Sequence, residues 1–291
     1  METTIEKTKS RSLASETWRR LKKNKGAIIG LIFLVVLVIA ALASGFIYDY
    51  DTQIIGQNIS QRLQRPSSEF WFGTDQVGRD IFARILYGAR YSLSISAGSV
   101  LIGLITGIIL GAVAGFYGGL ADDIIMRIAD VLYAIPNIMI AVVIVSLLGS
   151  STINLLLALS VSAATSFARI TRASVMTIRG QEYIESANAI GMPNWKIILK
   201  HVIPNCLSPI IVQVTLLIGT TIIAASSLSF LGIGVPAPAP EWGAMLSEGR
   251  DFMRSASYIC IIPGLVIMAT VLALNLLGDG LRDALDPKMK T

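Results

Sequence analysis

The chain has 291 residues, of which 53% are hydrophobic and only 15% are charged. Soluble domains average roughly 45–50% apolar and about 25% charged residues, so this composition argues against a soluble protein. The formal net charge is +5, and a single histidine and two cysteines leave little material for a metal centre or a disulfide framework.

Five stretches contain no Asp, Glu, Lys or Arg and are long enough to cross a bilayer: 26–48, 91–121, 131–168, 202–240 and 255–278. A span needs about 20 apolar residues, because about 30 Å of hydrocarbon is crossed at 1.5 Å per helical residue. The third stretch is too long for one span and breaks at Leu148-Gly149-Ser150-Ser151. We therefore predict an all-α polytopic membrane protein with six transmembrane helices, at about 26–48, 93–116, 128–148, 152–176, 206–230 and 258–278.

The two ends of the chain are polar and basic. With the N-terminus inside, 17 of the 24 Lys and Arg residues fall in cytosolic segments, which include residues 1–25, the loop 177–205 and residues 280–291. Cytoplasmic segments of membrane proteins are enriched in Lys and Arg, so both termini and this loop are predicted to lie in the cytoplasm. The basic balance then reflects topology and attraction to anionic lipid, and it requires no nucleic acid. Ala41-Leu42-Ala43 resembles a signal cleavage site, but the span-length apolar run around it favours an uncleaved anchor.

Residues 49–92 are predicted to lie outside, between the first two spans. Ile81 and Ala89 fall on one face of an amphipathic helix, and Asp80 and Arg84 stand four residues apart, at the spacing of a helical ion pair. We expect an interfacial helix here that leads into the second span.

Glycine recurs at every fourth residue of the second span, at Gly103, Gly107, Gly111 and Gly115, and Gly119 continues the series. This spacing places the glycines on one stripe, where the absence of side chains lets another helix approach closely. The stripe is a contact face, and both a helix of this chain and a second subunit remain candidates for the partner.

The third span contains Asp130 near its start and Pro136 in its interior. The proline is predicted to kink the helix. A kinked helix is a candidate for the wall of a transport pathway, and plain helix packing is the alternative.

The polar loop after the fourth span is predicted to form two short helices joined by a hinge. Ile184, Ala187 and Ile190 give the first helix a partly apolar face. Gly191 follows in the left-handed conformation typical of a helix end, and Pro193 suits the first turn of a second helix. Pro204 is expected to stop that second helix. An element of this kind protrudes from a membrane protein and offers its tip to a soluble partner.

The fifth span is followed by three alternating prolines, Pro236, Pro238 and Pro240. Alternating prolines forbid a helix and favour an extended segment. We expect an outer loop here, together with Arg250 and Arg254.

The polar loop resembles the "EAA…G" loop of ABC importer permeases. Glu185-Ser186-Ala187, Gly191 and Ile203-Pro204 carry the resemblance, although Ser186, His201 and Ile203 replace the Ala, Ile and Leu usual in that family. In that family the loop is the coupling helix, which docks into a groove of the cytosolic ATPase. The resemblance implies that the ATPase-coupling residues are Glu185, Ser186, Ala187, Ile190, Gly191 and Pro193.

Three further motifs are similar to the C-type permease subunit of dipeptide, oligopeptide and nickel importers. They are FGTDxxGRDxxxRxxxGAR at residues 72–90, LSFLGIG…P…WG at 228–243 and NLLGDGLRDALDP at 275–287. The resemblance implies a type I ABC importer permease fold, with residues 93–279 as the permease core. In the last motif, Arg282 is predicted to pair with Asp279 or Asp286 on a short cytosolic helix.

The resemblance also implies the assembly and the location. The chain forms half of a translocation pathway in a prokaryotic cell membrane, together with a second related permease, two ABC ATPase subunits and an extracytoplasmic solute-binding protein. The chain contains no GxxxxGK[ST] phosphate-binding motif, so we expect no catalytic residue and no cofactor in it, with ATP and Mg bound by the ATPases. Cys206 and Cys260 are interpreted as small apolar residues.

Di- or oligopeptides are the preferred substrates, and a nickel or metal-chelate importer is the alternative. An ion-coupled secondary transporter is disfavoured because the centres of the spans contain no ionisable residue. A membrane-embedded enzyme is disfavoured because no span contains a Ser/His/Asp or paired-carboxylate set.

Overall fold

The computed structural model describes residues 13–285, and in that part of the chain it is helical without a β-strand. Five helical runs are long and apolar enough to cross a membrane: α2 (Lys25–Ile47), α3 (Ile81–Tyr117), α6 (Thr152–Arg179), the run from α8 through α9 (Asn194–Phe230) and α11 (Tyr258–Leu285). A spanning segment must satisfy its backbone hydrogen bonds internally, and a helix does so. The predicted all-α polytopic fold is confirmed.

The third predicted span is broken rather than kinked. Two helices, α4 (Gly119–Ala134) and α5 (Asn137–Leu148), meet at an angle of 92°. Pro136 has no N–H to donate and disfavours helical geometry in the residue before it, and Ile135 is accordingly extended, with φ −88° and ψ 131°. Neither helix alone reaches the length of a span, so the pair is the candidate for a sixth crossing.

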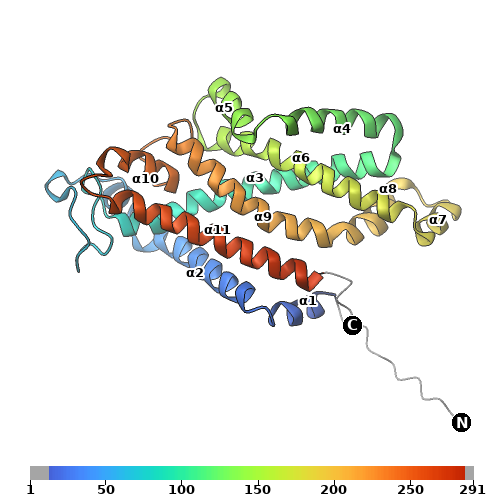
Figure 1. Ribbon diagram of the computed structural model, residues 1–291, viewed down its shortest axis with the longest axis horizontal. Helices are drawn as coiled ribbons and strands as arrows, with labels where there is room; N and C mark the ends of the chain where they lie inside the picture. The colour runs from blue at the N-terminus through green and yellow to red at the C-terminus, as the bar shows by residue number, and fades with distance from the viewer. Residues whose placement is uncertain (1–12, 286–291) are drawn as a thin grey trace, which may run out of the picture.

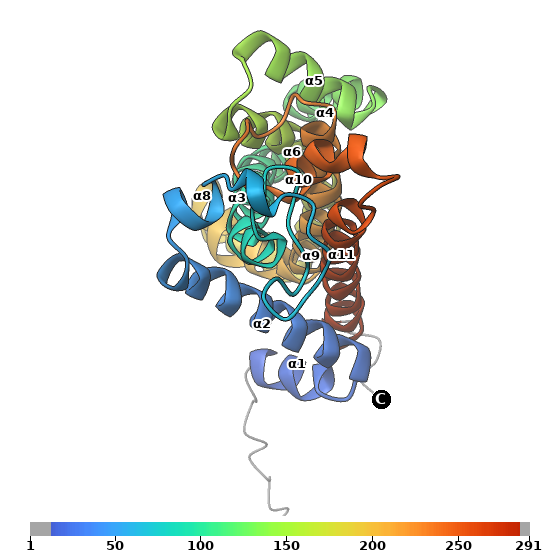
Figure 2. The same cartoon turned by 90° about the vertical axis from the view of Figure 1, so that its left-hand side faces the viewer.

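Apart from the α4–α5 pair, which lies along one side, the elements outside the long helices gather at the two ends of an elongated bundle (Figure 1). One end, called the α10 end below, bears α10 (Trp242–Gly249) and residues 48–80, with the short helices Tyr50–Ile54 and Ile59–Gln61. The opposite end, called the α7 end, bears α1 (Leu13–Leu21), α7 (Glu182–Ala189) and α8 (Asn194–Ile197). Seen end-on, α2 and the α4–α5 pair flank the central helices on opposite sides (Figure 2).

The segment expected to be an interfacial helix is instead the first part of α3, which runs without a break from Ile81 to Tyr117. Its apolar residues are buried within the protein: Ile81, Ile85 and Ala89 belong to one core cluster with Trp242. The amphipathic pattern was interpreted correctly as a helix, but the apolar face packs on protein rather than on lipid.

Three further boundaries differ from the prediction. The basic tail 1–25 contains the helix α1, and Leu21, the last residue of that helix, is buried with Ala27 and Ala284. Residues 1–12 and 286–291 lie outside the described part. Pro204 does not stop a helix: the helical run continues from α8 through the π-helical turn Ile198–Val202 into α9 (Ile203–Phe230), and Pro204 lies in the first turn of α9. α11 continues to Leu285 instead of giving way to a separate helix.

Candidate functional site

The loop between α6 and α9 forms the predicted pair of short helices, α7 and α8. One side of the loop faces the bundle: Ile184, Ala187 and Ile197 are buried in the cluster that contains Phe116 of α3 and Val175 of α6. The loop is therefore packed directly onto the ends of two spanning helices.

The hinge has the geometry that the sequence predicts. Gly191 has φ +77°, the left-handed region that favours glycine, and its N–H donates to the Asn188 carbonyl at 2.9 Å. The Met192 N–H donates to the Ala187 carbonyl at 3.1 Å, so the last carbonyls of α7 are satisfied. A β-carbon on Gly191 would meet no other atom, so glycine is required here for its backbone conformation rather than for space.

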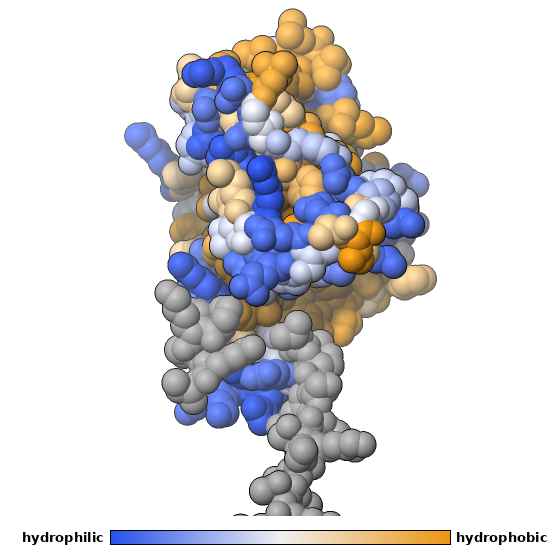
Figure 3. Space-filling view, turned by 90° about the vertical axis from the view of Figure 1, so that its right-hand side faces the viewer, coloured by the Kyte–Doolittle hydropathy of each residue, from blue (hydrophilic) through white to orange (hydrophobic). Residues whose placement is uncertain are grey.

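The other side of the loop is exposed, and part of it is apolar. Of the predicted coupling residues, Glu185, Ser186, Ile190, Gly191 and Pro193 are exposed, whereas Ala187 is buried. Ile190 is 78% exposed and Trp195 is 59% exposed. Figure 3 views this end of the molecule, where most of the surface is hydrophilic. Large apolar side chains on a hydrophilic end are typical of a surface that binds another protein.

The glycine stripe of α3 packs against α6 of the same chain. A methyl group built on any of Gly103, Gly107, Gly111 or Gly115 would overlap atoms of α6, including backbone atoms. This geometry resolves the alternatives left by the sequence in favour of a contact within the chain. Gly119 does not continue the stripe, because the helix breaks at Gly118 and nothing lies within 4 Å of a β-carbon at Gly119.

Charged residues also join α4 to α6. Arg172 forms a two-pronged ion pair with Asp122, its Nη2 lying 2.6 Å from Oδ2. Arg169 pairs with Asp130 at 2.6 Å and lies over the ring of Tyr133. These contacts hold the broken span against the helix that leads into the α7–α8 loop.

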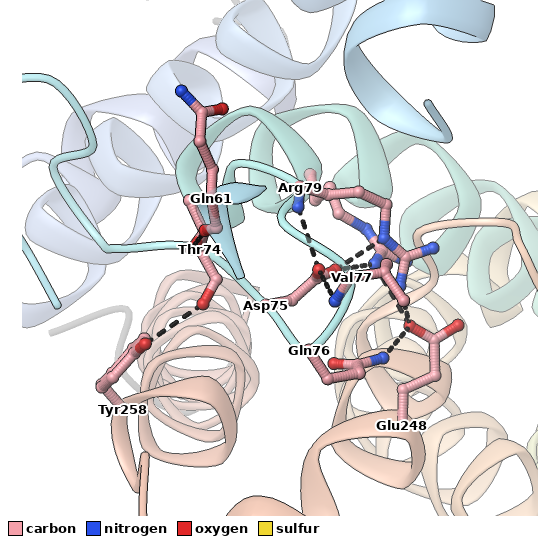
Figure 4. Close-up of polar contacts among 9 residues, drawn as sticks. Gln61, Thr74, Asp75, Gln76, Val77, Arg79, Glu248 and Tyr258 are labelled. Carbon is pink, nitrogen blue, oxygen red and sulfur yellow. Dashed lines mark hydrogen bonds and ion pairs between the residues drawn. The ribbon is translucent and has the colours of Figure 1, made fainter. Parts of the chain in front are cut away.

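The α10 end contains a buried cluster of two arginines and two carboxylates, Asp75, Arg79, Arg84 and Glu248 (Figure 4). Arg79 Nε lies 2.6 Å from Asp75 Oδ2, and Arg84 Nη1 lies 3.1 Å from Glu248 Oε2. Arg84 is only 1% exposed. The predicted pair of Asp80 with Arg84 is not formed: Asp80 caps the start of α3 by accepting from the Phe82 N–H, and Arg84 turns to Asp75.

The charges of this cluster stabilise one another. Burial alone would raise the pKa of Asp75, but the guanidinium groups of Arg84 and Arg79 outweigh burial and hold that pKa below its ordinary value, helped by N–H groups of Arg79 and Val77. The pKa of Asp80 is raised, because its burial outweighs the N–H groups that it accepts from. The cluster ties the segment before α3 to α10.

The segment after α9 contains no helix, as its prolines predict, but residues 231–240 form turns and bends rather than the expected extended loop. Residues 236–238 are exposed, whereas Val235 and Ala239 are buried. The residues that follow the segment are buried as well. Glu241 is fully buried, where its carboxylate accepts from the Ala244 N–H and the Ser92 hydroxyl and caps α10. Trp242 is also fully buried, and its Nε1 donates to the Ile85 carbonyl at 3.1 Å. The motif at 228–243 and the region of the motif at 72–90 are therefore hydrogen-bonded to each other at the α10 end.

Sequence reasoning missed Glu248 and Glu241 as structural residues. Glu241 lies within the recognised motif at 228–243 and Glu248 follows it, but nothing in the local pattern reveals that they face Ser92 and Arg79, which are 149 and 169 positions away. At the end of α11, Arg282 makes no ion pair with Asp279, and Asp286 is outside the described residues. Cys206 and Cys260 are buried free thiols, and the described residues contain no group of His, Cys, Asp and Glu suited to a metal ion.

Comparison with protein families gives two matches that together cover most of the chain. Residues 107–291 match the binding-protein-dependent transport system inner membrane component, and residues 12–66 match the N-terminal TM domain of oligopeptide transport permease C. The first match includes the α7–α8 loop and the helices on both sides of it.

Several curated proteins are similar over nearly the whole chain. The dipeptide transport system permease protein DppC of Alkalihalophilus pseudofirmus is 48% identical over 95% of this chain and 90% of its own length. The glutathione transport system permease protein GsiD of Pectobacterium atrosepticum is 44% identical over 95% of this chain and 91% of its own length. The di/tripeptide transport system permease protein DppC of Pseudomonas aeruginosa is 42% identical over 94% and 92%.

Among solved structures, a chain from an inward-facing conformation of the MetNI methionine ABC transporter has a similar fold. The TM-score is 0.57 at 17% sequence identity, and the match covers 71% of this chain and 98% of that one. The fold is therefore that of a type I ABC importer permease.

Proposed function

Because the chain belongs to the family of inner membrane components of binding-protein-dependent transport systems, we propose that it forms one half of the translocation pathway of an ATP-driven importer for di- or oligopeptides. It is a transport permease component and not itself an ATPase. The partners that complete this importer are a second related permease, two ABC ATPases that bind ATP and Mg, and an extracytoplasmic solute-binding protein.

The observation that carries this proposal is the two-sided α7–α8 loop. Its buried side contacts the ends of α3 and α6, and its exposed side presents Ile190 and Trp195. When the ATPases close on ATP, movement of the exposed side tilts the helices that are packed on the buried side. The pathway then changes from inward-facing to outward-facing.

The proposed orientation places the α7 end, with both termini, in the cytoplasm. It is supported by the distribution of charge, because 17 of the 24 Lys and Arg residues fall in the segments assigned to the cytoplasm. Single cysteines at Thr8 and at Lys290, in a cysteine-free background, should be shielded from an impermeant thiol reagent in intact cells. A cysteine at the exposed Glu69, at the α10 end, should react. Reaction at the two termini and not at Glu69 would reverse the orientation.

Peptides are favoured over nickel or metal chelates by the relatives, which are named as dipeptide, di/tripeptide and glutathione permeases. The test is uptake of a radiolabelled dipeptide by proteoliposomes that contain the complete complex and its binding protein. ATP enclosed in the proteoliposomes, on the side of the ATPases, should drive accumulation of the dipeptide inside them. A non-hydrolysable ATP analogue should not. Accumulation driven by a proton or sodium gradient without ATP would instead indicate a secondary transporter.

A further inference from the structure

A groove lies between α6, α9 and α11, in the half of the bundle nearer the α7 end. It has a volume of about 390 Å³, and its lining residues are Ile170, Ser208, Pro209, Val212, Gln213, Leu216, Arg282 and Leu285. Most of this lining is apolar, with an amide, a hydroxyl and a guanidinium among it. Ligand pockets typically combine an apolar lining with a few polar groups of this kind.

Two of the three walls are the helices that the α7–α8 loop joins. Ile170 lies on α6, which ends where the loop begins, and Ser208 to Leu216 lie on α9, which follows it. Any movement of the loop relative to the bundle therefore changes the width of this groove.

The Gln213 amide in the groove is held in place by one hydrogen bond and has a further hydrogen-bonding atom without a partner in the part of the chain that the structure describes. The amide of Gln213 donates from Nε2 to the Ser166 hydroxyl at 3.0 Å, which fixes the side chain and leaves its Oε1 without a partner among the described residues. Gln213 stands about 15 Å along α9, at a depth where an amide facing acyl chains is costly. An amide at that depth is better explained by an aqueous pathway.

Polar residues continue from Gln213 along the same face of α9. Thr220 and Ser227 follow at seven-residue intervals, which is nearly two helical turns, so the three lie on one stripe. Thr220 is exposed and Ser227 is partly exposed. Their hydroxyls donate to carbonyls of α9 itself, and each oxygen can still accept a hydrogen bond. Polar side chains therefore continue along this face of α9 beyond the groove.

The guanidinium of Arg282 supplies a positive charge at the groove. No ion pair joins it to Asp279 or Asp283, the carboxylates nearest to it on α11, and Asp283 is instead within 3.5 Å of the Asn24 amide. A guanidinium binds a carboxylate in a two-pronged geometry. A short peptide has such a carboxylate at one end, and its backbone amides match a glutamine and a serine.

We propose that this groove is a substrate-contact site of the permease, in which Gln213 and Ser208 bind the main chain of a short peptide and Arg282 binds its C-terminal carboxylate. The inference rests on the proposed peptide importer and adds the residues of this chain that contact the substrate. The other candidates for the occupant, a lipid phosphate at Arg282 or a side chain of the partner permease, are outcomes of the tests below.

The first test measures whether peptide occupies the groove. In the complete complex, with Cys206→Ala and Cys260→Ala as background, Val212→Cys in the groove is compared with Ile211→Cys, its neighbour outside the lining. A water-soluble maleimide should react with Val212→Cys, and the dipeptide Ala-Phe under ATP turnover should slow that reaction without affecting Ile211→Cys. Three results at Val212→Cys would overturn the proposal. The maleimide rate could be unchanged by Ala-Phe, it could be zero under all conditions, or it could vary with the phosphatidylglycerol content of the liposomes.

The second test measures the role of the guanidinium. Arg282→Gln should raise the KM for Ala-Phe uptake by about tenfold or more, the loss expected for a hydrogen bond to a charged group. Arg282→Lys should restore part of the affinity, and Arg127→Gln, an exposed arginine of α4, should leave uptake unchanged. An unchanged KM in Arg282→Gln would overturn the carboxylate contact. Absence of Ala-Phe uptake by the wild-type complex would contradict the peptide importer itself, so the two failures are distinguishable.

Discussion

The two ends of this permease differ in how much of their surface they bury. At the α10 end, Asp75, Arg79 and Arg84 are buried in one charge cluster, and two distant segments are tied together by it. At the α7 end, the α7–α8 loop buries only one side and leaves Ile190 and Trp195 in contact with solvent. The comparison teaches that one end is held together by its own buried contacts, whereas the other leaves apolar side chains exposed, which we propose bind the ATPase.

The largest expected effect comes from breaking the buried cluster. Asp75→Asn removes the carboxylate that both arginines share, and an uncompensated buried charge costs about 3–5 kcal/mol. We expect a large fall in the thermal midpoint of the purified protein. Asp251→Asn is the matched control at the same end, because the Asp251 side chain is 81% exposed and its contact with Arg250 is long, at 3.6 Å. Such an exposed pair contributes about 0–1 kcal/mol. Equal falls in the two variants would show that the buried cluster is not special.

The same cluster predicts a dependence on pH. The pKa of Asp75 is lower in the folded protein than in the unfolded chain, so the stability that it contributes is present above the ordinary aspartate pKa. That contribution is lost as pH falls through the lowered value in the folded state. The gap in thermal midpoint between wild type and Asp75→Asn should therefore be constant near neutral pH and should narrow below about pH 4. A gap that widens on acidification would contradict the assignment.

A smaller effect is expected where α3 and α6 meet. Gly107→Leu or Gly111→Leu places a branched side chain against the backbone of α6, and overpacking costs about 1–3 kcal/mol. We expect loss of stable protein or of transport in at least one of the two, measured by size-exclusion chromatography and uptake. Gly119→Leu provides a control for added volume, because the site is open. The φ of Gly119 is +55°, so Gly119→Leu also introduces backbone strain. Gly180→Leu is a second control without that strain, because the space around Gly180 is open and its φ is −84°. Wild-type behaviour of both stripe variants would remove the stripe from the packing core.

The smallest expected change in stability lies in the loop. Gly191→Val would force a β-branched residue into left-handed backbone, at a cost of about 1–2 kcal/mol, although the space around it is free. We expect membrane insertion and the thermal midpoint of the bundle to be nearly unchanged, while uptake falls. A large loss of folded protein would mean that the hinge belongs to the rigid part of the molecule.

The sequence predicted those features that depend on local pattern. Uncharged runs located the long helices, and the Gly191–Pro193 spacing predicted both the hinge and its left-handed glycine. The four-residue glycine spacing predicted a contact face. Each of these follows from helix periodicity or from the backbone preferences of one residue, so neighbours in the sequence suffice.

The errors arose where distant segments decide the outcome. The amphipathic start of α3 has the pattern of an interfacial helix, and only Trp242 and α10 reveal that protein covers its apolar face. Arg84 has a carboxylate at helical spacing in Asp80, yet it pairs with Asp75 and with Glu248, a residue 164 positions away. Pairings of this kind are set by tertiary packing, which no window of the sequence contains.

The central claim, that the exposed side of the α7–α8 loop couples this permease to its ATPases, is tested most directly by the ratio of peptide taken up to ATP hydrolysed. Glu185→Lys reverses an exposed charge beside Ser186, and Glu69→Lys reverses an exposed charge at the α10 end. Each variant is purified with its partner permease and ATPases and assayed in proteoliposomes for binding-protein-stimulated hydrolysis and uptake. The account predicts that Glu185→Lys loses bound ATPase or hydrolyses ATP without uptake, whereas Glu69→Lys keeps its ATPases. If Glu185→Lys and Gly191→Val both retain the ATPases and the wild-type ratio, the α7–α8 loop is not the coupling element.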